Sequence, residues 1–190
     1  MNRVYIEEQS FNNKDFTKVN LELGDYDYCK FINCKFNNSD ISDIAFSDCE
    51  FINCDLSMAN IANTAFRNVE FKACKLLGLS FEDCNKFGLE FTFDDCILNH
   101  ASFYKILLKK TIFSNTSLIE VDFTESNLEG AIFQNCDLQR AVFQNTNIQK
   151  ADFTTAINYS INPNINKVKK AKFSTEGAVG LLDVFGVIIK

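Results

Sequence analysis

Large apolar residues recur every five positions along the chain, and every fourth one belongs to a column of phenylalanines. This column advances by twenty residues, with one step of twenty-two, through Phe11, Phe31, Phe51, Phe71, Phe93, Phe113, Phe133, Phe153 and Phe173. A period this regular predicts a solenoid, in which each coil of twenty residues stacks on the coil before it.

The positions around each large apolar residue also follow a rule. Two positions earlier stands a small or modest residue, mostly Cys, Ala, Ser or Thr, and the remaining positions are mostly polar. Two inward and three outward residues in every five do not fit the 3.6-residue period of an amphipathic helix. They fit short extended segments joined by tight turns, with Asn and Asp suited to the corners. Four such segments would close one coil.

Segments such as CDLSMANIANTAF and SNLEGAIFQNCDLQRAVFQNTNIQKADF carry this unit across roughly residues 4 to 157. They resemble the pentapeptide-repeat family, with its A(D/N)LxX unit. The resemblance implies an all-β fold, a right-handed quadrilateral β-helix. We therefore expect this β-helix over residues 1–173. Its last coil, 154–173, should be irregular, because Pro163 stands at an expected apolar position.

Residues 174–190 leave the repeat and predict a short α-helix followed by a tail. The helix should begin after Ser174 or Thr175, and Gly186 is a suitable stop. A solenoid end exposes apolar residues and needs a cap, which this segment would supply. The segment is more apolar than a cap requires, so we also expect a homodimer contact there. The candidate cap and dimer residues are Val179, Leu181, Leu182, Phe185, Val187, Ile188 and Ile189.

The frame breaks once, within residues 86–92, where the two extra residues lie. Lys86 falls on a position that should be apolar, and burying an unpaired lysine is costly. We therefore expect a bulge. Either Phe87 or Leu89 fills the gap by local repacking, or Phe87 projects outward as a recognition knob.

All eight cysteines occupy the small inward position, so they should form buried, reduced columns. Thiols in such a column lie at the strand spacing of about 4.8 Å, whereas a zinc site needs them to converge on one point and a disulfide needs closer Cβ atoms. His100, the single histidine, falls at an outward corner. The sequence therefore predicts no metal site, no cofactor and no catalytic residue, and thus a protein that is not an enzyme.

The net charge is −6, which disfavours direct binding of nucleic acid. One side of the coil collects the candidate partner-binding carboxylates, with Lys105 as its only evident base; they are Glu22, Asp40, Asp43, Glu82, Asp83, Asp122 and Glu125. The next side of the coil is acidic in its N-terminal coils and becomes basic from Arg67 onward. Past Phe153, a lysine run over 167–172 is either a solvated face or a contact with an acidic partner or another subunit.

Within the family, the chain is similar in length, acidity and C-terminal appendage to the quinolone-resistance (Qnr) proteins and their mycobacterial relative. These gyrase-protecting proteins are described as acidic, dimeric rods that resemble duplex DNA. Here, seven carboxylates over about seven coils give one charge per ~5 Å of rod. Duplex DNA presents one per ~1.7 Å, so any mimicry of DNA is partial.

Two functional hypotheses follow from these patterns. The first is a protein–protein interaction scaffold with an unidentified partner. The alternative is a Qnr-like binder or protector of DNA gyrase or topoisomerase IV, acting through the acidic side and Phe87. No apolar stretch reaches the length of about eighteen residues that a membrane span needs. The start, MNRVYIEEQSF, lacks the layout of a signal peptide, so we expect a cytoplasmic location without membrane contact.

Overall fold

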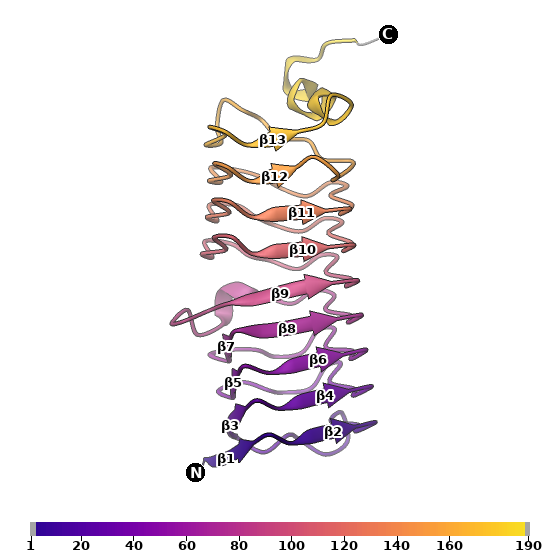
Figure 1. Cartoon of the computed structure of the whole chain (residues 1–190), viewed down its shortest axis with the longest axis vertical. Coiled ribbons are helices and arrows are strands. Elements are labelled where there is room, and N and C mark those ends of the chain that lie inside the picture. The colour runs from indigo at the N-terminus through magenta and orange to yellow at the C-terminus, as the bar shows by residue number, and fades with distance from the viewer. Residues whose placement is uncertain (1–2, 189–190) are drawn as a thin grey trace.

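The computed structural model describes residues 3–188, which form a parallel β-solenoid of about eight turns. The coils stack along one long axis, with the two termini at opposite ends (Figure 1). The all-β solenoid predicted from the repeat is confirmed. A chain of five-residue units stacks in this way because no single coil can bury its own apolar side chains.

Two parallel sheets run along the rod. The longer sheet contains nine strands: β2 (Ser10–Asn12), β4 (Lys30–Ile32), β6 (Glu50–Ile52), β8 (Val69–Lys72), β9 (Phe91–Asp94), β10 (Ile112–Ser114), β11 (Ile132–Gln134), β12 (Asp152–Phe153) and β13 (Lys172–Phe173). The shorter sheet contains β1 (Val4–Glu7), β3 (Gly24–Asp27), β5 (Ala45–Ser47) and β7 (Ala65–Arg67). Elsewhere the coils join through isolated parallel bridges, such as those of Asp40 with Asn60 and Lys35 with Asp55.

The longer sheet carries the phenylalanine column in the register that the sequence predicts. Phe11 pairs with Phe31, and Phe71 pairs with Phe93 across the step of twenty-two residues. Consecutive rings of the column stack with centroids 4.5 to 5.4 Å apart and planes no more than 20° from parallel. Offset stacking at this separation is favourable for aromatic pairs. The core is therefore continuous through the frame break.

The corners of the coils use left-handed backbone. The residue two positions after most of the large apolar residues has a positive φ, at Asn and Asp in many coils but also at Met58, Ala73 and Lys105. Asn tolerates this conformation best among residues with a side chain. The corner amides also bond along the rod, since Asn53 Nδ2 donates to Asn33 Oδ1 at 2.7 Å.

All eight cysteines are free and buried, as the sequence predicts. Their thiols lie against backbone carbonyls; Cys54 Sγ, for example, has the carbonyl oxygens of Phe31 at 3.2 Å and Ile52 at 3.4 Å as acceptors for its single S–H. Burial raises the pKa of Cys49 and of Cys136 to about 12. These thiols therefore remain protonated at neutral pH and serve as packing groups.

The frame break forms a local bulge after η1, a short 3-10 helix over Phe81–Asp83. The backbone leaves the ladder after Asn85, whose N–H donates to Thr64 O at 3.0 Å, and rejoins it where Glu90 N–H donates to Phe66 O at 2.9 Å. Leu89 packs against the core, whereas 80% of the Phe87 surface is exposed. Of the two residues that could fill the gap, Leu89 does so and Phe87 projects outward.

The α-helix predicted for the C-terminal segment is wrong. The segment forms two 3-10 helices, η2 (Gly177–Leu181) and η3 (Asp183–Phe185), and no α-helix occurs within residues 3–188. Gly177 and Gly180 lower the helix propensity of a segment already too short to be helical alone. They allow close packing instead, because a Cβ on Gly180 would lie 2.1 Å from the carbonyl oxygen of Tyr159. Leu181 packs against the core from this segment.

Across the described part of the chain, none of the helices is both long and apolar enough to cross a membrane.

Candidate interaction surfaces

The acidic side is the side of the rod whose inward residues are Leu21, Ile41, Ile61, Phe81, Phe103, Phe123 and Phe143. The seven predicted carboxylates lie on four of its seven coils, one beside Leu21 and two each beside Ile41, Phe81 and Phe123, so they form an interrupted row along the rod. Most of them are exposed, and Glu82 and Asp122 are half-buried. Their spacing is set by the coil repeat, because bridges such as that between Ser102 and Asp122 fix each coil on the next.

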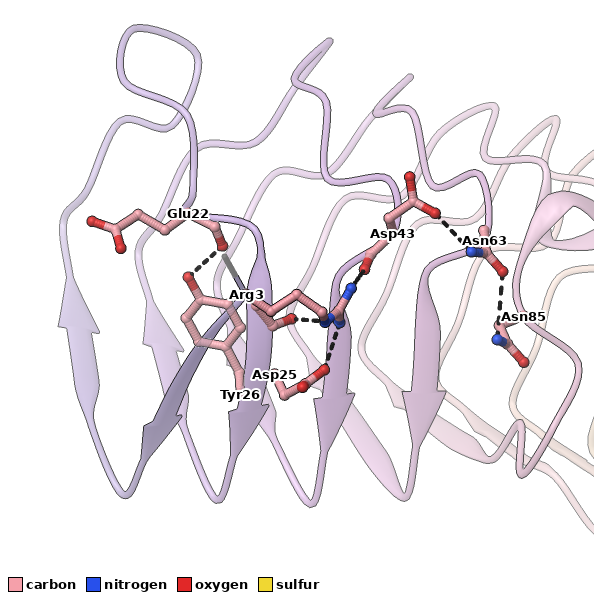
Figure 2. A network of polar contacts seen from close by, with 8 residues as sticks. Arg3, Glu22, Asp25, Tyr26, Asp43, Asn63 and Asn85 are labelled. Carbon is pink, nitrogen blue, oxygen red and sulfur yellow. Dashed lines mark hydrogen bonds and ion pairs between the residues drawn. The ribbon is translucent and has the colours of Figure 1, made fainter. Parts of the chain in front are cut away.

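Near the N-terminal end, hydrogen bonds hold the acidic row in place (Figure 2). Asp40 Oδ1 accepts from Ser42 N–H and from Asn60 Nδ2, both at 3.0 Å. These bonds, from Ser42 first and then Asn60, lower the pKa of Asp40. Asp43 Oδ1 accepts from Asn63 Nδ2 at 2.6 Å. These hydrogen bonds therefore favour the ionised form of Asp40 and orient both Asp40 and Asp43 before any partner arrives.

Arg3 joins this network, and sequence reasoning missed it. Its guanidinium pairs with the Asp25 carboxylate and donates to the Asp43 carbonyl oxygen at 2.8 Å. The twenty-residue period contains the signal for this contact, because it pairs Val4 with Gly24 and so places Arg3 next to the following coil. Figure 2 shows the Glu22 carboxylate pointing away from Arg3 and Asp43.

The later part of the acidic side is less uniform. Glu82 lies in η1, and its Oε2 atom is buried without a hydrogen-bond partner among the described residues. Asp122 Oδ1 accepts from Thr124 N–H at 2.8 Å. Glu125 pairs with Lys105 Nζ at 3.5 Å. The exposed negative charge is thus strongest at Asp83 and weaker toward Glu125.

The bipolar side is the neighbouring side, whose inward residues include Tyr26, Phe46, Phe66, Leu108, Leu128 and Ile148. Its first half is the sheet β1–β3–β5–β7 and carries five carboxylates: Glu7, Glu8, Asp25, Asp27 and Asp48. Its second half carries six exposed lysines: Lys109, Lys110, Lys150, Lys167, Lys169 and Lys170. The Phe87 bulge lies between the two halves.

Only one carboxylate lies among these lysines. Glu129 pairs with Lys150 at 2.7 Å and with Lys109 at 3.3 Å, and both lysines lower its pKa. The lysine half therefore keeps a strong positive excess, which the sequence indicated only in part.

With the coil geometry established, comparisons with known proteins identify the family. A model of the pentapeptide repeat region matches residues 25–92 and 90–160. The chain belongs to the pentapeptide-repeat family. A comparison with curated proteins gave no match.

Solved structures of QnrB1, described as a plasmid-mediated fluoroquinolone resistance protein, are similar to this pentapeptide-repeat protein. One trypsin-treated QnrB1 variant superposes with a TM-score of 0.70 at 21% identity, covering 98% of this chain and 92% of that one. A second trypsin-treated variant gives 0.63 at 17% identity, with coverage of 99% and 98%. At these identities the likeness shows a shared fold.

The C-terminal segment of this pentapeptide-repeat protein divides into inward and outward residues. Leu181 contacts the core, whereas Val179, Leu182, Phe185, Val187 and Ile188 are exposed, and Ile189 lies outside the described residues. The packing of Leu181 fits a cap. The exposed residues are available for the predicted dimer contact, which stays a prediction.

Other chemistry-bearing groups of this pentapeptide-repeat protein lie apart from these surfaces. His100 occupies a corner, as predicted, and its Nδ1 lies 3.1 Å from Glu120 Oε2. Between residues 3 and 188, no three His, Cys, Asp or Glu side chains are placed to hold a metal ion. At the N-terminal end, a cavity of about 410 Å³ opens between apolar residues that include Phe11, Phe16 and Leu21.

Proposed function

We propose that this pentapeptide-repeat protein is a non-enzymatic, cytoplasmic scaffold that binds a protein partner through its acidic side. The observation that carries the proposal is the row of mostly exposed carboxylates, which lie on four coils of one side and are held in place by a continuous buried core. The right-handed, four-sided cross-section implied by the family belongs to the same proposal, as does the domain division into residues 1–173 and 174–190.

A rigid charged surface loses little conformational entropy on association, so less of the interaction energy is offset. The stacked core fixes the backbone, and hydrogen bonds such as that from Asn63 to Asp43 already orient the side chains. A partner with a basic surface fits this row by charge complementarity. Phe87 projects from the bulge beyond Asp83 and would supply an apolar contact.

The second candidate is DNA gyrase or topoisomerase IV. The likeness to QnrB1, a fluoroquinolone resistance protein by its description, supports it at the level of fold. The charge spacing argues for only partial DNA mimicry, since the row is already sparser than duplex phosphate and Lys105 neutralises Glu125 within it. In this proposal the protein binds the enzyme and contacts neither nucleic acid nor membrane.

The first experiment compares partner capture from native cell extract by the wild-type protein and by a charge-reversal variant. The variant combines Asp83→Lys, Asp122→Lys and Glu125→Lys. The rod accepts lysine at equivalent positions, as at Lys75 and Lys105. The matched control reverses three carboxylates of the phenylalanine column's side: Glu70→Lys, Asp94→Lys and Asp95→Lys.

We expect the partner to be lost from the acidic-side variant and retained by the control. Equal retention by both variants would contradict the use of the acidic side. A gyrase supercoiling assay, with and without a fluoroquinolone, then tests the second candidate. Protection that disappears in the acidic-side variant would support it, whereas no effect of the wild-type protein would exclude gyrase and leave the scaffold proposal standing.

The proposal includes a homodimer through the C-terminal segment. The exposed residues Leu182 and Phe185 suit a two-fold apolar contact. In sedimentation at high salt, where contacts between charged surfaces are screened, the wild type should be a dimer and the chain ending at residue 173 a monomer. A stable monomer at tens of micromolar would contradict it.

A further inference from the structure

On the bipolar side, the negative and positive charges lie in opposite halves of the rod, whereas on the acidic side they do not. We propose that this side is self-complementary, so that two copies of the chain pack antiparallel along it, about a two-fold axis at the Phe87 bulge. This contact uses neither the carboxylates of the acidic side nor the C-terminal segment, and it shares only Phe87 with the proposed partner contact.

The charges of the two halves are opposite and large. The first half carries five carboxylates against Arg3 and Arg67, a net charge of −3. The second half carries six exposed lysines against Glu129, a net charge of +5. Opposite charges on facing surfaces favour association and fix the register of the partners.

The coil positions match under a two-fold axis. Counting from the bulge, Asp25 and Asp27 lie three coils before it, and Lys150 lies three coils after it. Glu7 and Glu8 lie four coils before it, and the lysines at 167, 169 and 170 lie four coils after it. Because a two-fold contact is made twice, each of these pairings occurs at both ends of the interface.

Nearer the axis the charges match less well. Arg67 lies one coil before the bulge and faces Lys109 and Lys110 one coil after it, which costs energy. A Cβ on Gly88 would lie 3.5 Å from Arg67 Cδ, so the arginine stem lies against the bulge. The favourable pairings therefore lie toward the two ends of the contact.

Two large apolar side chains are exposed near the centre of the bipolar side, beside the exposed Lys86. Phe87 is 80% exposed and Leu107 is 60% exposed. Leu107 lines one pocket of about 200 Å³ with Gly88 and Leu89, the two residues that follow Phe87, and with Lys86 and Lys105. Apolar side chains near the middle of a contact, with charged residues around them, are typical of protein interfaces. Two Phe87 side chains would meet at the axis.

The charge distribution also indicates which partner fits the bipolar side. A polyanion attracted to the lysine half would meet five carboxylates farther along the same side and a net charge of −6 on the whole chain. A second copy meets attraction at both ends. The contact spans about eight coil steps, or ~38 Å, and one side is ~16 Å wide, which gives ~600 Å² per copy. A standard interface buries about 800 Å² per partner, so we expect a weak dimer that salt dissociates.

Complementary charge variants test the contact. One variant combines Glu7→Lys, Glu8→Lys and Asp27→Lys, leaving Asp25 with Arg3. The other combines Lys150→Glu, Lys167→Glu and Lys170→Glu. In sedimentation at low ionic strength, each variant alone should self-associate at least about tenfold more weakly than the wild type. An equal mixture of the two should restore the dimer, and circular dichroism verifies that both remain folded.

A cross-link locates the axis. All eight native cysteines are buried, so Phe87→Cys places a thiol at an exposed position. Oxidation by diamide removes two electrons and two protons from two such thiols and should link the copies through position 87. Met58→Cys, at a residue that is 62% exposed on another side, should not link.

Three results would overturn the proposal. The first is a wild-type protein that stays monomeric at low salt. This includes a monomer that binds duplex DNA through its lysine half and no longer binds it in the Lys→Glu variant. The second is a mixture of variants that fails to associate. The third is a dimer that ignores both charge variants and disappears on removal of residues 174–190; that result assigns dimerisation to the C-terminal segment alone.

Discussion

At the scale of single residues, each position in the five-residue unit has one chemical task. The small inward position requires a side chain that fits between coils and satisfies a carbonyl of the previous coil. Cys136 Sγ donates to Phe113 O at 3.4 Å, and Thr146 Oγ1 donates to Phe123 O at 2.8 Å. Cysteine and threonine are therefore interchangeable for packing, but only the thiol titrates in the alkaline range.

Cys136 should make the stability of the rod depend on alkaline pH. Burial raises its pKa from about 9 to about 12, so the unfolded chain loses this proton first as the pH rises. Its contribution to the free energy of unfolding is complete below pH 9 and falls by about 1.4 kcal/mol per pH unit between pH 9 and 12. When the free energy of unfolding is measured with urea at several pH values, we expect Cys136→Ala to remove this part of its decrease between pH 9 and 12.

Thr146→Ala is the matched control for this measurement. It removes a buried group from the same inward position and should lower the free energy of unfolding equally at every pH. A pH slope for Cys136→Ala that equals the wild-type slope would show that the thiol ionises as easily in the folded rod as in the unfolded chain.

At the scale of elements, the sequence predicted the regular coils and the bulge at the frame break, but not the form of the C-terminal segment. The phenylalanine column fixes which residues face inward, and the structure follows it from Phe11 to Phe173. The C-terminal segment has no such column, and its form depends on how Gly180 packs against Tyr159, which no local pattern encodes. The Arg3 contacts were missed for a different reason, because they depend on side-chain reach between coils.

We attribute the bulge to a single residue, Lys86. Removing Phe87 and Gly88 restores the twenty-residue step, but it moves Lys86 to an inward position. We expect this deletion to cost about 3 kcal/mol or more in the free energy of unfolding, since the buried ammonium has no partner there. Adding Lys86→Leu to the same deletion should recover most of the loss, as measured by urea unfolding.

The comparison of these two deletions separates charge from chain length. If both were equally unstable, the loss of Leu89 from the core would be the cause. If the first deletion were as stable as the wild type, Lys86 would not be the reason for the bulge.

At the scale of the whole molecule, the two ends of the rod differ, while the middle is uniform. The N-terminal coil leaves an open apolar cavity beside Phe11 and Phe16, whereas Leu181 covers part of the core at the C-terminal end. In a solenoid each coil is stabilised only by its neighbours, so an uncovered end opens more easily than a covered one. The charged surfaces proposed for binding therefore lie on a scaffold that is most rigid at its centre.

Native-state hydrogen exchange should report this difference coil by coil. The amide of Ile132, which donates to Thr111 O at 3.0 Å, lies in the middle and should exchange slowest. The amide of Lys172, which donates to Ala151 O at 2.9 Å beneath the cap, should exchange faster, and that of Lys30, bonded to Gln9 O at 2.8 Å near the open end, fastest. Ending the chain at residue 173 should raise the exchange rate of the Lys172 amide to that of Lys30 and leave the rate of Ile132 unchanged.

Equal exchange rates at all three amides would mean that the rod opens only as one unit. An unchanged rate at Lys172 in the shortened chain would mean that the C-terminal segment does not stabilise the last coil.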